Sequence, residues 1–265
     1  MIISDSKRFV FIHIPKCGGT SVRQQLSYLD ERGGAYEARV DEHPAIGATD
    51  FVHLPMATLK AFFSEEYERV QSYRSFAILR EPHERFQSAV AQFCNYQTDT
   101  PFKLLSTKAL EVIVRGLADR LESQAARLQS TMPLPPPLIH FQPQRDYIFC
   151  GEQRIVQTIT PIDELYRLEA ELQFFLGHKV SFEEKANQSL NYRSERSRRI
   201  LNAINRITPA PGRFIPSFMR TFLGKALYDS QPKAISDLFE SDFVVEFVES
   251  FYANDLELWQ QRKEL

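Results

Sequence analysis

The chain has little of what marks several large protein classes. It has three cysteines, Cys17, Cys94 and Cys150, which are far apart and form no Cys-x-x-Cys pair, so neither a zinc site nor a disulfide framework is indicated. This cysteine usage fits a reducing compartment. No apolar run reaches the roughly 18 residues that a membrane-spanning helix needs, and residues 1–15 lack the features of a secretion signal. We therefore expect a cytoplasmic protein with no transmembrane segment.

An excess of positive charge is also missing. The chain has 32 Lys and Arg against 34 Asp and Glu, for a formal net charge of −2 at pH 7. Non-specific nucleic-acid affinity depends on many contacts between basic side chains and phosphates, so nucleic acid is not an expected partner. With 265 residues, 43% of them hydrophobic, the chain is globular and could bury about three-quarters of its unfolded surface. We expect one domain over residues 1–265.

The most informative stretch is residues 9–21, with the sequence FVFIHIPKCGGTS. Its first four residues are apolar and partly β-branched, which predicts a strand covered on both faces, and a proline and two glycines then end it. A helix should begin at Thr20 or Ser21 and run to about Leu29. Glycines let the backbone approach a ligand, and a helix start offers unpaired N–H donors. The stretch is therefore suited to holding an anion.

Lys16, beside these glycines, adds a full positive charge that could reach a phosphate oxygen. The spacing differs from that of nucleoside-triphosphatase loops, in which the interval between glycines is longer and the lysine directly precedes Ser or Thr. The motif therefore implies no Mg²⁺ and disfavours a nucleotide kinase. An ordinary strand–turn–helix connection with an exposed lysine remains the alternative.

The loop FIHIPKCGGTS resembles the 5′-phosphosulfate-binding loop of sulfotransferases that use 3′-phosphoadenosine 5′-phosphosulfate (PAPS). Its Pro-Lys-x-Gly-Gly-Thr-Ser form is similar to that of membrane-type carbohydrate sulfotransferases and their bacterial relatives, including the heparan 2-O-sulfotransferase type. The resemblance implies an α/β fold, a P-loop-like three-layer α/β/α arrangement with a central parallel sheet and helical insertions. It also implies a set of cofactor-binding residues in this loop: Pro15, Lys16, Cys17, Gly18, Gly19, Thr20 and Ser21.

A histidine follows the next predicted strand end, Asp-Phe-Val-His at residues 50–53. Ligands bind beyond the carboxyl ends of strands in open parallel sheets, so His53 should lie near the Lys16 loop. The segment resembles the Gly-His-x-Pro-type stretch of the family, in which the histidine is the catalytic base, although valine replaces the glycine here. A structural or merely exposed histidine is the alternative reading. His140 and His13 are the competing candidates for the base.

A second motif follows the strand predicted for residues 75–79. The sequence of residues 80–88, REPHERFQS, resembles the Arg-x-Pro-x-x-Arg-x-x-Ser motif that binds the 3′-phosphate in this family. In relatives the first arginine and the serine contact that phosphate, which assigns the contact to Arg80 and Ser88. An arginine and a hydroxyl are groups that suit an anion. The alternative is a charged helix start in which Arg85 pairs with a nearby glutamate.

The rest of the chain alternates between helical and strand patterns. An apolar stripe predicts a helix over 107–129 that faces the core, and residues 132–137 form a stiff proline-rich connector. Residues 154–159 predict a strand, and residues 161–177 a helix ending at a glycine. The last predicted helix, 239–259, contains a sequence similar to the Tyr-x-x-Asp-x-x-Leu helix of the family. The alternation predicts a parallel sheet.

A short stretch after the connector contains His140, Gln142 and Gln144 and is similar to a Pro-Gln stretch of the family. These side chains could line the acceptor side of the site, or they could be loop polar groups whose hydrogen bonds are satisfied internally.

Two later features of the sequence also suggest contacts with ligands. Asn187 and Ser189 resemble an Asn-x-Ser stretch near the cofactor in relatives, although such a pair is also common in plain turns. The run 196–228 contains seven basic and no acidic residues. It could attract an anionic glycan, a membrane surface or the cofactor's phosphates, or it could be a solvated face.

These patterns predict a PAPS-dependent sulfotransferase that transfers a sulfuryl group to a hydroxyl of an acceptor, which the resemblance suggests is a carbohydrate. Lys16 would stabilise the departing 5′-phosphate and His53 would take the acceptor's proton, with no metal involved. A lipid or small-alcohol acceptor, and a non-catalytic nucleotide- or anion-binding relative, remain alternatives. The resemblance points to a bacterial-type enzyme, and the sequence does not predict an oligomeric state.

Overall fold

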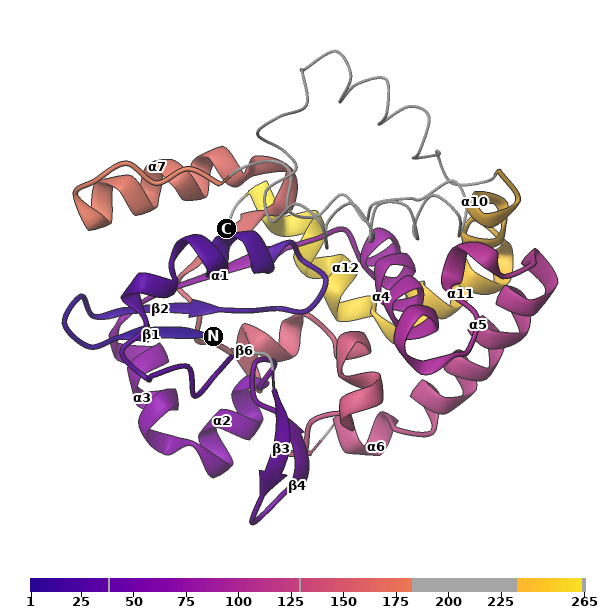
Figure 1. The fold of residues 1–265 in the computed structure, drawn as a ribbon, viewed down its shortest axis with the longest axis horizontal. Coiled ribbons are helices and arrows are strands. Elements are labelled where there is room, and N and C mark those ends of the chain that lie inside the picture. Colours follow the sequence, from indigo (N-terminus) through magenta and orange to yellow (C-terminus); the bar gives the residue numbers. More distant parts are fainter. Residues whose placement is uncertain (38, 129, 183–232, 264–265) are drawn as a thin grey trace, which may run out of the picture.

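The computed structural model describes residues 1–37, 39–128, 130–182 and 233–263. The Asn187 and Ser189 pair and the basic run 196–228 lie outside these residues. A four-stranded sheet in the order β1-β2-β5-β8 forms the centre of the fold (Figure 1). Its strands are β1 (Ile2–Ser4), β2 (Phe9–Ile12), β5 (Arg74–Leu79) and β8 (Thr158–Pro161).

The central sheet is mostly parallel. β5 pairs in parallel with β2 on one side and with β8 on the other, while β1 adds an antiparallel edge. All four residues of β2 and the last five of β5 are buried, which is why both strands are continuous apolar runs in the sequence. The predicted α/β fold with a central parallel sheet and flanking helices is confirmed.

Helices cover both faces of the sheet and share its core. α1 (Gly19–Gln25) lies above β1 and β2 in Figure 1, whereas α2 (Met56–Phe62) and α3 (Ser64–Ser72) lie below them. α7 (Leu165–Leu176) follows β8 and ends at Gly177, whose left-handed φ of 76° makes glycine the favoured residue there.

A second hydrophobic cluster surrounds the helix that follows β5. That helix, α4 (Pro82–Gln97), packs with the short helical segment Pro136–Phe141 and with four further helices (Figure 1). These four are α5 (Thr107–Glu122), α10 (Lys233–Phe239), α11 (Asp242–Phe251) and α12 (Ala253–Gln260). The apolar stripe of α5 is buried in this cluster, so its predicted role in the core is confirmed.

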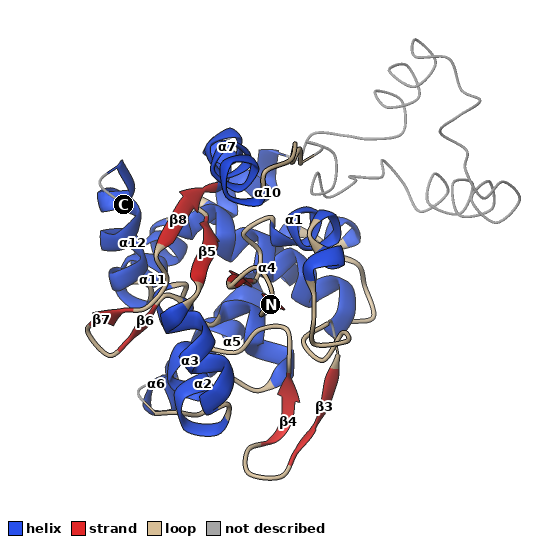
Figure 2. Ribbon diagram, turned by 90° about the vertical axis from the view of Figure 1, so that its left-hand side faces the viewer, coloured by secondary structure: helices blue, strands red, loops and turns tan. Residues whose placement is uncertain are grey.

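The strand that precedes His53 is not part of the central sheet, so that prediction is wrong. β4 (Gly47–Asp50) pairs with β3 (Val40–His43) in a separate hairpin that projects from the body of the molecule (Figure 2). β3 is largely exposed and mostly polar, as suits a hairpin with one solvated face.

Three predicted elements are interrupted. The segment 154–159 divides into β7 (Gln153–Arg154), which pairs with β6 (Phe149–Cys150), and β8, because the Arg154 guanidinium binds the carbonyl oxygens of Val156 and Gln157 and holds a bend there. The helix predicted for 107–129 breaks into α5 and α6 (Ala125–Leu128). The final helix predicted for 239–259 is divided into α11 and α12, and its first residue is the last of α10.

None of the described helices is long and apolar enough to cross a bilayer. The three cysteines are free thiols.

Candidate active site

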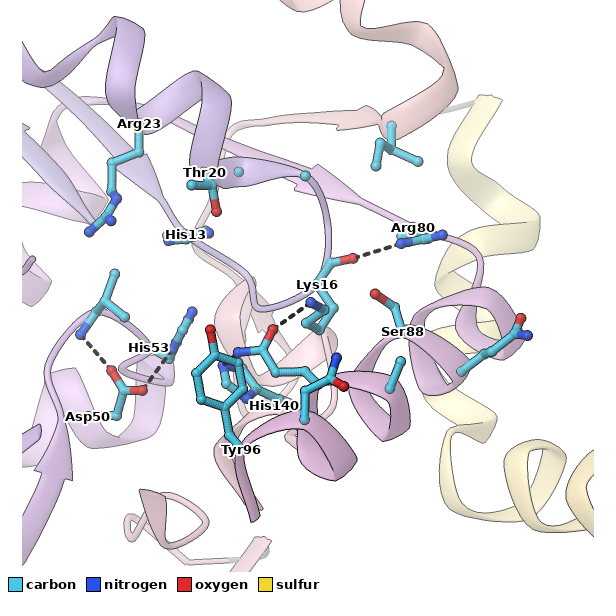
Figure 3. Close-up of a pocket in the computed structure, with 18 of the residues that line it drawn as sticks. His13, Lys16, Thr20, Arg23, Asp50, His53, Arg80, Ser88, Tyr96 and His140 are labelled. Carbon is cyan, nitrogen blue, oxygen red and sulfur yellow. Dashed lines mark hydrogen bonds and ion pairs between the residues drawn. The ribbon is translucent and has the colours of Figure 1, made fainter. Parts of the chain in front are cut away.

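A cleft of about 750 Å³ opens where β2 and β5 end, a size typical of small-molecule sites. The loop after β2, the turn after β4, one face of α4 and His140 line it. Figure 3 shows the three histidines on one side of the cleft, Arg80 and Ser88 on the other, and Lys16 between them.

The loop after β2 has an unusual backbone. Lys16 has a φ of 66° and Gly18 a φ of 77°, so two left-handed residues turn the chain within three positions. A left-handed lysine is uncommon and is a form of strain that concentrates at functional sites. Gly19 is also required sterically, since a Cβ there would lie 2.4 Å from the His13 ring. The two glycines therefore allow the loop to pass close to His13.

Only part of the predicted loop set faces the cleft. Lys16, Gly18, Gly19 and Thr20 line it, whereas Pro15, Cys17 and Ser21 do not. The Cys17 thiol is buried and donates to Oε1 of Gln144 at 3.1 Å, and burial raises its pKa to about 12. Because α1 has only seven residues, its dipole contributes little, and Lys16 supplies most of the positive charge of the loop.

Lys16 is partly buried, and its ammonium donates to Oε1 of Gln92 at 2.6 Å. Burial, and next the charge of Arg80, lower its pKa to about 8, so it is still mostly protonated at neutral pH. Nη1 of Arg80 donates to the Lys16 carbonyl oxygen at 3.4 Å. An anion bound between the two cations would relieve their repulsion.

Arg80 is held by its backbone as well as by its side chain. Oε1 of Gln144 accepts from the Arg80 N–H and Nε2 of Gln144 donates to the Arg80 carbonyl oxygen, both at 2.9 Å. The guanidinium pairs with Glu84 at 3.3 Å, one turn into α4. Ser88 lies one further turn along the same helix face and lines the cleft, so the two predicted 3′-phosphate residues lie on the same side of it.

Arg85 and the two glutamines do not line the cleft. The Arg85 side chain is buried, and its Nη2 lies 3.7 Å from Oδ2 of Asp255. Its Nη1 donates to the His140 carbonyl oxygen at 3.1 Å. The alternative, in which Arg85 pairs with a nearby glutamate, is therefore wrong. Gln142 and Gln144 are buried and form hydrogen bonds within the protein. This favours a structural role in the loop over contact with the acceptor.

Three histidines meet at the other side of the cleft. The ring centroids of His13 and His53 are 5.0 Å apart, and those of His53 and His140 are 5.3 Å apart. Nδ1 of His53 lies 3.1 Å from Oδ2 of Asp50. Burial lowers the pKa of all three histidines, with the Asp50 carboxylate opposing the effect at His53, so they are neutral at pH 7.

His53 thus lies near the Lys16 loop for a reason other than the one predicted. The turn after the separate hairpin carries it against His13, which follows β2 directly. The cleft also contains residues that sequence reasoning missed, among them Arg23, Arg39, Asp50, Gln92 and Tyr96. Gln92 and Tyr96 follow Ser88 by four and eight residues, and this spacing in the sequence places all three on one helix face.

Among the described residues, Asp50, His53 and His140 form a group whose potential ligand atoms all lie within 4.8 Å of one another. Asp50 and His53 already share a hydrogen bond, and His140 is bonded to Gln92. Oδ2 of Asp50, Nδ1 of His53 and Nε2 of His140 therefore already have partners within the protein. The absence of a metal stays a prediction.

A cationic cleft at the ends of parallel strands, with neutral histidines facing it, is the layout of an α/β group-transfer enzyme. The family model described as the Sulfotransferase family matches residues 1–134, which is 134 of the 265 residues. The chain belongs to the sulfotransferase family, and its general activity is sulfuryl transfer. No curated protein and no solved structure matched the chain.

Proposed function

We propose that the protein transfers the sulfuryl group of PAPS to a hydroxyl of a carbohydrate, as enzymes of the heparan 2-O-sulfotransferase type do. The observation that carries the proposal is the position of Lys16 and Arg80 in one cleft, joined by a hydrogen bond of 3.4 Å and facing a cluster of neutral histidines. PAPS carries phosphate groups at the 3′ and 5′ positions of its ribose, and Lys16 and Arg80 offer a cation for each of them.

The residues present fit this co-substrate. The cleft volume suits a nucleotide, and the mutual repulsion of Lys16 and Arg80 favours an anion between them. In the proposed complex Lys16 and the amides of Gly18 to Thr20 hold the 5′-phosphosulfate. Arg80 and Ser88 hold the 3′-phosphate, and roles for Pro15, Cys17 and Ser21 would be confined to the backbone.

PAPS supplies a sulfur atom bonded to a phosphate that can leave. His53 removes the proton of the acceptor hydroxyl as that oxygen bonds to sulfur and the bond between sulfur and the 5′-phosphate oxygen breaks. Lys16 neutralises the charge that grows on the departing phosphate, which is where electrostatic stabilisation has the largest effect. The residues on both sides of the cleft hold the donor and acceptor in line.

The acceptor would enter beside the histidines, where the exposed ring of Tyr96 stands at the edge of the cleft. Such a ring can pack against a sugar face, which favours a glycan over a small alcohol. A lipid acceptor and a non-catalytic relative are the other outcomes. Three expectations from the sequence stay predictions: roles for Asn187 and Ser189, a single domain over 1–265, and a cytoplasmic location.

Incubation with ³⁵S-labelled PAPS and a panel of glycans, lipids and small alcohols tests the proposal. We expect label in a glycan, strongly reduced in Lys16→Ala and unchanged in Lys7→Ala, an exposed lysine outside the cleft. Tight binding of adenosine 3′,5′-bisphosphate without any labelled product would instead indicate a scaffold. Label confined to lipids or small alcohols would overturn the carbohydrate assignment.

A further inference from the structure

The hydrogen bonds of the three clustered histidines determine which ring nitrogen carries the proton in two of them. A carboxylate only accepts hydrogen bonds, an ammonium only donates, and a neutral histidine has one nitrogen of each kind. Wherever a histidine nitrogen faces a group of fixed type, its own protonation is therefore determined.

Asp50 determines the state of His53. Burial would raise the pKa of Asp50, but the hydrogen bond from His53 and the other contacts of the carboxylate, among them the Val52 N–H, together outweigh it. The pKa is lowered, so Asp50 is a carboxylate at neutral pH. Its Oδ2 faces Nδ1 of His53 at 3.1 Å, so Nδ1 must carry the proton. Nε2 of His53 is then unprotonated, and in the described part of the chain it has no hydrogen-bond partner.

The turn between them makes this arrangement rigid. Oδ1 of Asp50 accepts from the Val52 N–H at 3.1 Å, and the Asp50 carbonyl oxygen accepts from the His53 N–H at 3.2 Å. Both carboxylate oxygens therefore have hydrogen-bond partners, one in the backbone and one in the His53 ring. The Asp50 side chain is only 12% exposed, so water does not compete freely for it.

A second chain of hydrogen bonds determines the state of His140. The Lys16 ammonium must donate to Gln92, which fixes Oε1 of Gln92 toward Lys16 at 2.6 Å. The amide nitrogen of Gln92, a donor, then faces Nε2 of His140 at 3.2 Å. Nε2 of His140 must accept, so its proton lies on Nδ1 and its lone pair is already used. Burial and the charges of His53 and Lys16 also lower the pKa of His140 to about 3.

Within the described residues, His13 has no hydrogen-bond partner that would fix its tautomer. Its Nδ1 is buried without a hydrogen bond, and the opposite edge of the ring is packed against Gly19. His53 is therefore the one histidine of the three with a fixed tautomer and an available basic nitrogen.

We propose that Asp50 and Gln92 are positioning residues that select the base, Asp50 by holding His53 with Nε2 unprotonated and Gln92 by occupying Nε2 of His140. The reaction that uses this base rests on the proposed function. The tautomers themselves can be measured without any turnover.

NMR of ¹⁵N-histidine-labelled protein bound to adenosine 3′,5′-bisphosphate reads the tautomers directly. The six histidine signals can be assigned by removing one histidine at a time. We expect the proton on Nδ1 in both His53 and His140. A wild-type His53 protonated on Nε2 would overturn the proposal, whether or not the protein transfers sulfate. Correct tautomers in a protein that transfers nothing would leave the proton placement intact and reject the proposed function.

The Asp50→Asn variant provides the functional test. Its amide oxygen keeps the Val52 N–H, so its NH₂ group faces Nδ1 of His53 and moves the proton to Nε2. We expect kcat to fall by about 10²–10⁴-fold with the KM for PAPS unchanged. Asp50→Ala leaves both tautomers accessible and should lose less activity than Asp50→Asn.

A purely structural role for Asp50 would give the opposite order, because asparagine preserves the turn and alanine does not. Loss of more activity in Asp50→Ala than in Asp50→Asn, with the His53 tautomer unchanged in both, would therefore refute the proposal. Asp99→Asn, on an exposed loop, is the matched control for the loss of one negative charge. Gln92→Glu should move the His140 proton to Nε2, and an unmoved proton would contradict the role given to Gln92.

Discussion

Replacing Arg80 with alanine should remove most of the preference for a nucleotide with a 3′-phosphate. Arg80 and Ser88 are the residues assigned to that phosphate, and both line the cleft. A hydrogen bond to a charged group contributes about 1.5–3 kcal/mol. Arg80 already pairs with Glu84 at 3.3 Å and its side chain is 27% exposed, so the lower end applies. About 1.5 kcal/mol corresponds to roughly a tenfold loss in affinity.

Calorimetry with adenosine 3′,5′-bisphosphate and AMP measures this preference. Wild-type protein should bind the bisphosphate clearly more tightly, and Arg80→Ala should weaken that binding about tenfold while changing AMP binding little. Arg115→Ala is the matched control, because Arg115 also pairs with a glutamate one turn away, Glu111, on an exposed helix face. Equal binding of the two nucleotides by wild-type protein, or a preference that survives in Arg80→Ala, would refute the assignment.

Three further outcomes follow from the same contacts. Burial and Arg80 lower the pKa of Lys16 to about 8, so bisphosphate affinity should fall as the pH rises above that value. Calorimetry in a pH series should show no such fall in Lys16→Arg, whose guanidinium stays protonated. Burial lowers the pKa of His53 although Asp50 opposes the effect, so kcat should be independent of pH around 7 and decline only below about 6.5. A pH–rate profile measures this, and a decline that begins above pH 7 would contradict it. Asp255→Ala should lower the free energy of unfolding by about 3–5 kcal/mol in urea titrations, because it leaves the buried Arg85 without its ion-pair partner. A loss under about 1 kcal/mol would be inconsistent with that ion pair.

Elements with a continuous apolar pattern could be predicted closely from the sequence. β2 was predicted at its observed residues, and β5 begins one residue earlier than predicted, because buried parallel strands need no contact information to be recognised. The prediction of one strand over 154–159 was wrong because the local structure there depends on contacts that the sequence pattern does not contain. Its interruption depends on hydrogen bonds from the Arg154 side chain to carbonyl groups that only the folded backbone brings into reach.

The candidate site was predictable where a motif is local and not where it depends on tertiary contacts. Lys16, Arg80 and Ser88 each lie within a short motif, and all three line the cleft. The pairing of His53 with Asp50 spans only three residues but needs the turn that follows β4. The link from Lys16 through Gln92 to His140 joins residues far apart in sequence, and no spacing indicates it.

The most direct test of the central claim is the single-turnover rate of ³⁵S transfer from PAPS to the glycan acceptor in His53→Ala and His140→Ala. We expect His53→Ala to bind the bisphosphate normally and to lose about 10²–10⁴-fold in rate, since it removes the available basic nitrogen. His140→Ala should lose much less, because Nε2 of His140 is occupied by Gln92 at 3.2 Å. Near-normal transfer by His53→Ala together with its abolition in His140→Ala would move the base to His140 and contradict the account.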